Sequence, residues 1–123
     1  MPRPRCFIVQ EPMKKDMVSG MMVPMLDFRK VVEYGDPVVL VTTSRIGFTP
    51  GPLFDTIRDK MRDITDEDFI VPTGDPVAMF AVAMVAADLC NGKVNCLKWD
   101  KTRSEYIAIR MDSHYRTRKG ELE

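Results

Sequence analysis

Thr73, Gly74 and Asp75 form the stretch of this sequence whose residue types best suit ligand binding. They follow the short apolar run FIVP and precede a long apolar segment that begins at Pro76. A turn between a strand and a helix presents free backbone N–H groups and the positive end of the helix dipole to an anion. Ligands of open α/β sheets also bind at the carboxyl ends of strands. The turn is therefore a candidate phosphate or nucleotide site, with Arg45 of the preceding glycine- and proline-rich loop as a second contributor.

The same turn also has a simpler interpretation as the start of a helix. Asp75 is a good N-cap, because its carboxylate accepts hydrogen bonds from the N–H groups that a phosphate would need. Pro76 at the first helical position removes one of those N–H groups. The sequence contains neither GxxxxGK[ST] nor GxGxxG, the patterns of established phosphate-binding loops. Helix capping is therefore the favoured role of the turn, and ligand binding is the alternative.

Side chains that could act as nucleophiles or metal ligands are few and scattered. Cys6, Cys90 and Cys96 form no CxxC pair, and the single histidine, His114, lies in a polar tail. A Cys–His pair would require this tail to fold back, and a zinc site needs about four closely arranged ligands. The sequence predicts no catalytic residue, no metal and no cofactor. An odd number of cysteines without a signal peptide favours the reducing cytoplasm.

The overall composition gives no electrostatic reason to expect a nucleic-acid or membrane partner. Lys and Arg together number 18, equal to the 18 Asp and Glu, in a chain of 123 residues. No apolar run approaches the roughly 20 residues that cross a bilayer. Trp99 lies between Lys98 and Lys101, so base stacking, with help from the arginines of the tail, keeps nucleic-acid binding open as a third alternative.

Hydrophobic patterning predicts the elements that position these residues. Apolar and β-branched runs predict strands, and an amphipathic and an apolar segment predict helices: strands 6–10, 38–43, 69–72, 94–99 and 105–111, and helices 53–64 and 76–90. The alternation indicates an α/β fold, a small mixed sheet with a central βαβαβ portion, an N-terminal strand or hairpin and a C-terminal antiparallel edge strand.

Three finer predictions concern the N-terminal half and the ends of the chain. The continuous apolar run 38–41 suggests a strand buried on both faces, with residues 26–34 forming a hairpin with it. The methionine-rich segment 13–25 lacks periodicity and is predicted to be a loop. One domain is expected over residues 1–123, with flexible ends at 1–5 and 113–123.

The predicted helix 76–90 has no polar side chain between residues 77 and 87, so it cannot be a surface helix with one wet face. Its second face must be covered within the domain or by another subunit. Met79, Phe80 and Met84 are candidate interface residues on this helix. Met21 and Met22 are candidates in the methionine-rich segment, because thioether side chains adapt to varied apolar partners. The leading hypothesis is a non-enzymatic protein that binds a protein partner or itself, for example as a homodimer.

A resemblance adds context to this hypothesis. Residues 68–111 contain an Asp-aromatic-apolar strand followed by the residues Gly-Asp-Pro, an Ala-rich helix that ends in the sequence NGKV, and the sequence LKWD before a short final strand. In these features the chain resembles small uncharacterised proteins of tailed bacteriophages, especially marine ones. The resemblance implies a viral protein made in the cytoplasm of a bacterial host. Because such proteins have no assigned activity, it assigns no catalytic or binding residue.

Overall fold

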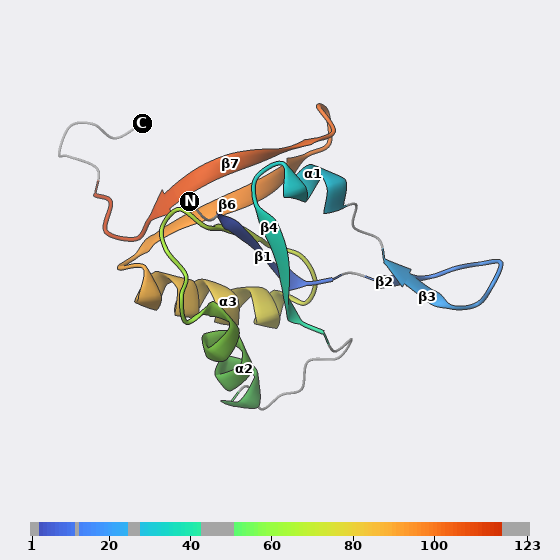
Figure 1. Cartoon of the computed structure of the whole chain (residues 1–123), viewed down its shortest axis with the longest axis horizontal. Coiled ribbons are helices and arrows are strands. Elements are labelled where there is room, and N and C mark those ends of the chain that lie inside the picture. The colour runs from blue at the N-terminus through green and yellow to red at the C-terminus, as the bar shows by residue number, and fades with distance from the viewer. Residues whose placement is uncertain (1–2, 12, 25–27, 43–50, 117–123) are drawn as a thin grey trace.

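Five strands form one mixed sheet at the centre of the fold (Figure 1). A computed structural model describes residues 3–11, 13–24, 28–42 and 51–116. The sheet order is β4-β1-β5-β6-β7, with β1–β4, β1–β5 and β5–β6 parallel and β6–β7 antiparallel. The strands are β1 (Arg5–Gln10), β4 (Asp36–Val41), β5 (Phe69–Val71), β6 (Lys93–Asp100) and β7 (Glu105–Asp112). The predicted α/β class, parallel core and antiparallel edge are confirmed.

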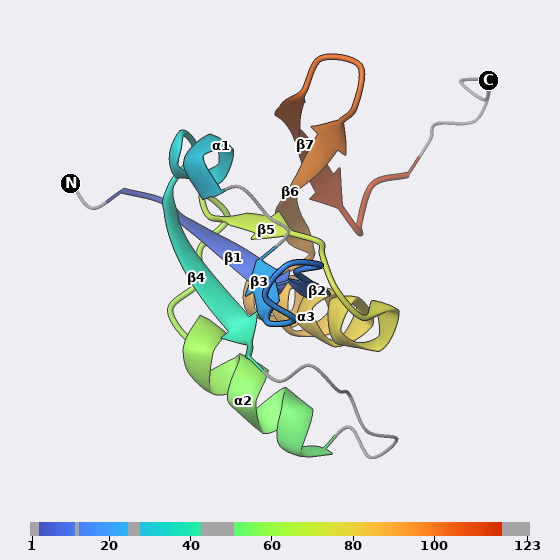
Figure 2. The same cartoon turned by 90° about the vertical axis from the view of Figure 1, so that its right-hand side faces the viewer.

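Helices cover the two faces of the sheet unequally (Figure 2). Helices α2 (Gly51–Met61) and α3 (Pro76–Leu89) lie on one face and pack against each other. The short helix α1 (Phe28–Val32) lies on the other face. The α2–α3 side holds the larger apolar core, which includes Phe7, Ile57 and Val82, and the α1 side holds a smaller core around Ile8 and Leu97.

Helix α3 begins and ends where the sequence predicts. Asp75 has an extended backbone and its side chain accepts a hydrogen bond from Val77 N at 2.8 Å, with Pro76 in the first turn. Beyond the helix, Asn91 and Gly92 have φ values of +53° and +82°, the left-handed conformation that ends helices. The prediction that Asp75 of the turn Gly74-Asp75-Pro76 caps the helix is confirmed.

The run 38–41 lies in an edge strand although it is covered on both faces. Burial on both faces is confirmed, because Leu40 and Val41 belong to the core on the α2–α3 side and Val39 packs against the core on the α1 side. The central position that such a run indicates is wrong, because β4 lies at the edge of the sheet. An interior position belongs to β1, in which the side chains of Cys6, Phe7 and Ile8 are completely buried.

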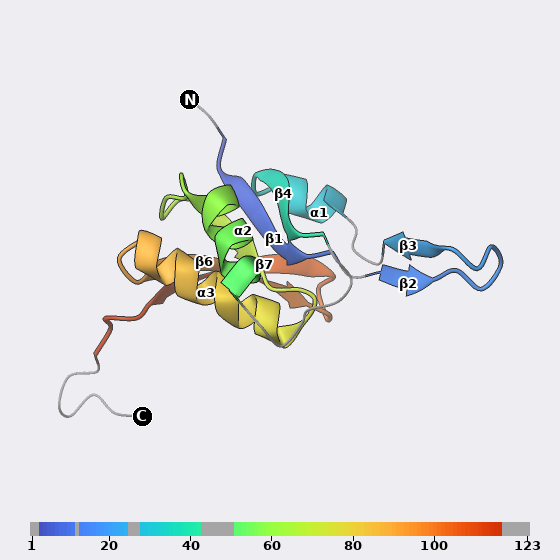
Figure 3. The same ribbon diagram turned by 90° about the horizontal axis from the view of Figure 1, so that it is seen from below.

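Two further predictions for the N-terminal half are wrong. Residues 28–32 form α1 instead of a strand, and only one of its two valines, Val31, is buried. The predicted loop 13–25 contains a β-hairpin of β2 (Met13–Lys15) and β3 (Met22–Pro24), which Figure 3 shows standing away from the body. Its turn is closed by Asp16, whose carboxylate accepts from Val18 N at 3.0 Å and from Ser19 Oγ at 2.9 Å.

Asp68 is a buried acidic residue that fastens the start of the sheet. Its carboxylate accepts hydrogen bonds from Arg5 N at 2.8 Å and Thr65 N at 3.0 Å, and it pairs with the Arg5 guanidinium at 3.4 Å. These bonds hold the turn before β5 against the first residue of β1. Removal of the carboxylate would leave backbone donors without a partner in a part-buried place, which costs more than the net value of the bonds.

We expect Asp68→Ala to lower the free energy of unfolding by about 2 kcal/mol, because unsatisfied buried donors cost roughly 1–3 kcal/mol. Urea denaturation followed by circular dichroism measures the change. Asp63→Ala is the matched control, since the side chain of Asp63 is 79% exposed and its only described ion pair is with an exposed arginine. Equal losses in the two variants would contradict a specific structural role for Asp68.

Candidate functional site

The predicted anion site at Thr73, Gly74 and Asp75 is held tightly by Gln10 at the end of β1. Thr73 Oγ1 donates to the carbonyl of Gln10 at 2.7 Å, and Asp75 N donates to Gln10 Oε1 at 2.7 Å. Gly74 has a φ of +96°, and a Cβ there would clash with the side chain of Gln10, so glycine is required. A ligand at the turn would have to displace these bonds and the capping bond of Asp75. Arg45 lies outside the described residues.

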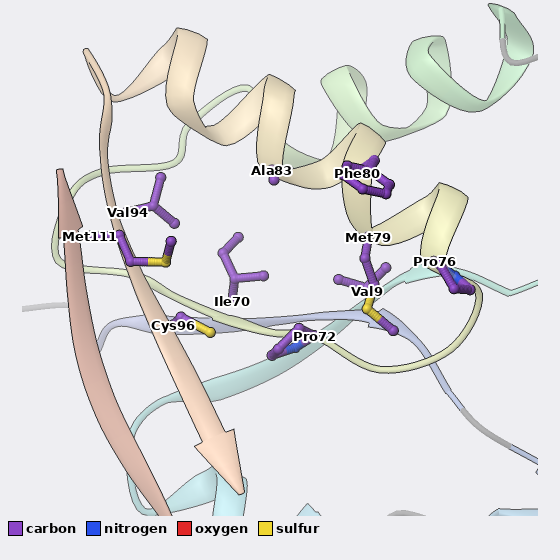
Figure 4. A pocket seen from close by; sticks show the side chains of 10 residues that line it. All are labelled: Val9, Ile70, Pro72, Pro76, Met79, Phe80, Ala83, Val94, Cys96 and Met111. Carbon is purple, nitrogen blue, oxygen red and sulfur yellow. The ribbon is translucent and has the colours of Figure 1, made fainter. Parts of the chain in front are cut away.

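A second feature is an apolar cleft between α3 and the sheet, shown with its lining side chains in Figure 4. Its volume is about 330 Å³ and its walls are apolar. Phe80 and Ala83 line it from the helix, Val94 and Cys96 from β6, and Met111 from β7. The candidate residue Met79 also lines the cleft and is half-buried. The cleft exists because α3 lies over β1 and β6, and no described helix follows to cover β7.

The apolar lining continues along the hairpin beyond the cleft. Cross-strand register places Ile107, Ile109 and Met111 of β7 opposite residues 98, 96 and 94 of β6, on the side of the sheet that faces α3. These three side chains are left 37%, 40% and 54% exposed. An antiparallel strand with one wet face normally shows polar residues there. This face of the hairpin is apolar and uncovered.

The outer side of α3 is apolar as well. Phe80 at the rim of the cleft is 73% exposed, and Met84, one helical turn further, is 63% exposed. We use the name α3–β7 face for the surface made by the residues on both sides of the cleft: Phe80, Ala83, Met84, Val94, Cys96, Ile107, Ile109 and Met111. The sequence analysis named Phe80 and Met84 of this face as candidate interface residues. It predicted the strand 105–111 but not that one side of this strand is an exposed apolar surface.

The other predicted interface residues, Met21 and Met22, lie on the β2–β3 hairpin, far along the chain from α3. Both are exposed, as are Met17 and Val18 at the tip. Figure 3 shows this hairpin projecting from the body, so its apolar side chains do not form one surface with the α3–β7 face.

Trp99, proposed for base stacking, packs within the β6–β7 hairpin. Its ring meets that of Tyr106 edge-on, with centroids 4.9 Å apart. Register and the alternation of side chains place Trp99 on the α1 side of the sheet, whereas Lys98 lies on the α3 side. The structure therefore does not bring these two residues together, and nucleic-acid binding stays an untested prediction.

The three cysteines are free thiols, and burial holds them in the neutral form. Burial raises the pKa of Cys6 from 9.0 to about 11. Burial also raises the pKa of Cys90 and of Cys96. In the part of the chain that the structure describes, no group of three His, Cys, Asp or Glu side chains is arranged to hold a metal ion.

Comparison with known proteins gives one result. The sequence model of a family described as phage Pam3 gp32-like protein matches residues 4–113. No curated protein and no solved structure matches the chain. The matched range includes all five strands of the main sheet and the whole α3–β7 face. Among the described residues, no helix is both long enough and apolar enough to span a membrane.

The raised pKa of Cys6 predicts a loss of stability in alkali. The folded state keeps the proton to about pH 11, whereas the unfolded chain releases it near pH 9. The stabilising contribution is therefore complete below pH 9 and falls by about 2–3 kcal/mol as the pH rises to about 11. Urea denaturation at several pH values, compared with Cys6→Ala, isolates this thiol. Parallel stability curves for the two proteins would contradict the prediction.

Proposed function

The chain belongs to the phage Pam3 gp32-like protein family, and from this premise we propose that it acts by binding a second copy of itself through the α3–β7 face. The expected origin in a bacteriophage is confirmed, and the family match extends beyond residues 68–111 to the N-terminal half. The family description names no reaction. Support for the function therefore has to come from the surface of the protein.

The observation that carries the proposal is the extent of exposed apolar surface on one side of the molecule. Monomeric soluble proteins rarely expose contiguous apolar patches larger than a few hundred Å². Here an exposed helix side, an apolar cleft and an apolar strand row adjoin one another. Burial of such a surface is favourable by about 25 cal/mol per Å², so water leaves it readily when a partner binds.

A second copy is the partner that fits this surface. The α3–β7 face presents a helix that is apolar on its outer side and, next to it, the strand β7, which no described helix covers on this side of the sheet. The exposed side of the helix and the uncovered side of the hairpin complement each other, because the helix of one copy can cover the hairpin of another copy. The chain also carries no net charge, so two copies do not repel each other at long range.

The arrangement of the apolar residues favours this face over the β2–β3 hairpin. The α3–β7 face is built on a helix and two eight-residue strands that belong to the main sheet. The β2–β3 strands have three residues each, and isolated two-stranded hairpins are marginally stable. A rigid surface loses less conformational entropy when it binds.

The small-ligand alternative has less support. Two N–H groups of the turn 73–77 that a phosphate would use, those of Asp75 and Val77, already donate to Gln10 and to the Asp75 carboxylate. A thermal-shift titration with inorganic phosphate and nucleoside triphosphates distinguishes the alternatives, since a ligand at 100 times its Kd adds about 2.7 kcal/mol of stability.

We expect the native chain to sediment as a dimer and the double variant Phe80→Ser, Met84→Ser to dissociate. Each side chain that is buried at an interface contributes about 1.5–3 kcal/mol, and each occurs twice in a symmetric dimer, so the dimer Kd should rise at least about ten-thousandfold. Sedimentation velocity over a concentration series measures this change. Circular dichroism checks that the variant is folded.

The matched control is Met21→Ser, Met22→Ser, which removes two exposed apolar side chains from the β2–β3 hairpin. Its dimer Kd should equal that of the native chain. A native chain that stays monomeric at the highest concentration would overturn the proposal. Dissociation of the control, with the α3 variant unaffected, would assign the association to the hairpin.

A further inference from the structure

We propose that the helices α3 of two copies lie antiparallel, side by side between the two sheets, so that each covers the β6–β7 hairpin of the other copy and Asp88 of each meets Lys98 of the other. This inference rests on the proposed self-association and adds its geometry. Sheets would form the two outer layers and the paired helices the middle layer. It is derived from the dimensions, the charges and the edge of the sheet.

The dimensions of the helix and the hairpin agree. Helix α3 has 14 residues and is about 21 Å long at 1.5 Å per residue. Strands β6 and β7 have eight residues each, about 26 Å at 3.3 Å per residue. Small side chains, Ala83 and Ala87, stand on the side of α3 that faces the open strands and line the cleft or its extension. They permit close approach of a second helix.

A single charge on each element fixes the direction of the second helix. Asp88 is the only charged residue within α3, and Lys98 is the charged side chain on the α3-facing row of β6 between the apolar residues and the hairpin turn. Both are exposed. Beyond Lys98, Asp100 is paired with Arg103 at 3.7 Å, and Glu105 lies opposite Asp100. Between α3 and the middle of β6 the interface would therefore hold one negative charge on the helix and one positive charge on the strand, while Arg110 and Asp112 line the extension of the cleft.

Geometry brings these two charges together only when the helices are antiparallel. Because α3 connects the parallel strands β5 and β6, it runs in the opposite direction to both. Helix α3 ends at Leu89 and β6 begins at Lys93, so Asp88 lies near the start of β6. Lys98 lies five residues beyond that start, about 16 Å along the strand and toward its other end.

A two-fold axis at the level of the middle of β6 thus carries Asp88 of the second copy toward Lys98. Within one chain the two side chains lie on opposite sides of that level, so they do not pair with each other. A parallel arrangement of the helices would leave both charges without a partner in the interface.

The free edge of β7 is partly occupied by contacts within the chain. Ser113 N donates to Gly92 O at 2.8 Å, so alternation along the strand points the backbone groups of Tyr106 and Asp112 outward. The carbonyl of Tyr106 accepts from Tyr34 Oη at 2.7 Å, and that of Asp112 accepts from Tyr115 N at 3.1 Å. A strand that added to this edge would have to displace both bonds, whereas the α3–β7 face is open without any such change.

Charge reversal tests this arrangement without touching the apolar surface. Asp88→Lys and Lys98→Glu should each weaken dimerisation by about tenfold at low salt, because two attractive pairs become repulsive. An equimolar mixture of the two variants should recover the native Kd, since a mixed dimer contains one reversed pair and one native pair. Sedimentation velocity at low and high salt measures the Kd, and the differences should shrink as salt increases.

Each result of this experiment decides a separate point. If the native chain is dimeric but the single variants associate normally, or the mixture does not recover, the antiparallel arrangement is overturned and the proposed function remains. If the native chain is monomeric, both are overturned. A weaker dimer of Asp88→Lys would not result from a destabilised helix, because the substitution places a positive charge near the C-terminal end of α3, where the helix dipole favours it.

Discussion

A parallel sheet has to be covered on both faces, and the rest of this fold follows from how far that cover extends. Helices α2 and α3 protect β4, β1 and β5 on one side, and α1 protects the other side less completely. On the α3 side, the cover by described helices ends at β6. The antiparallel strand β7 continues the sheet beyond it, and on that side it carries isoleucine and methionine where water would favour polar residues. The apolar cleft lies at the boundary between the covered and uncovered parts.

The turn Gly74-Asp75-Pro76 connects this boundary to the sheet. Gln10 at the end of β1 binds both Thr73 and Asp75, so the first turn of α3 is fixed relative to β1 by hydrogen bonds as well as by packing. Asp75 caps the helix, and Gly74 allows the close approach of Gln10. The residues that looked most like a phosphate site therefore determine where α3 begins, and with it the width of the cleft.

Local rules were sufficient for the C-terminal half of the fold and insufficient for the N-terminal half. Helix periodicity identified α2, and the capping residue Asp75 and the pair Asn91-Gly92 marked the two ends of α3. These elements and the β6–β7 hairpin are specified by neighbouring residues. The interior position of β1 in the sheet depends on its pairing with β4 and β5, which are distant in sequence. The paired valines of α1 resemble a strand until burial shows that only Val31 faces the core.

The candidate surface was predicted in part for the same reason. An apolar helix without a polar side chain indicated that α3 needs a second cover, but exposure of Ile109 depends on the absence of a described helix over β7. The most direct measurement is an isotope-filtered NOE experiment on an equimolar mixture of methyl-labelled and unlabelled protein. Reciprocal cover predicts intermolecular contacts between the methyl groups of Met84 and of Ile107 or Ile109. A spectrum with no intermolecular contact from Met84, in a sample at high concentration, would contradict it.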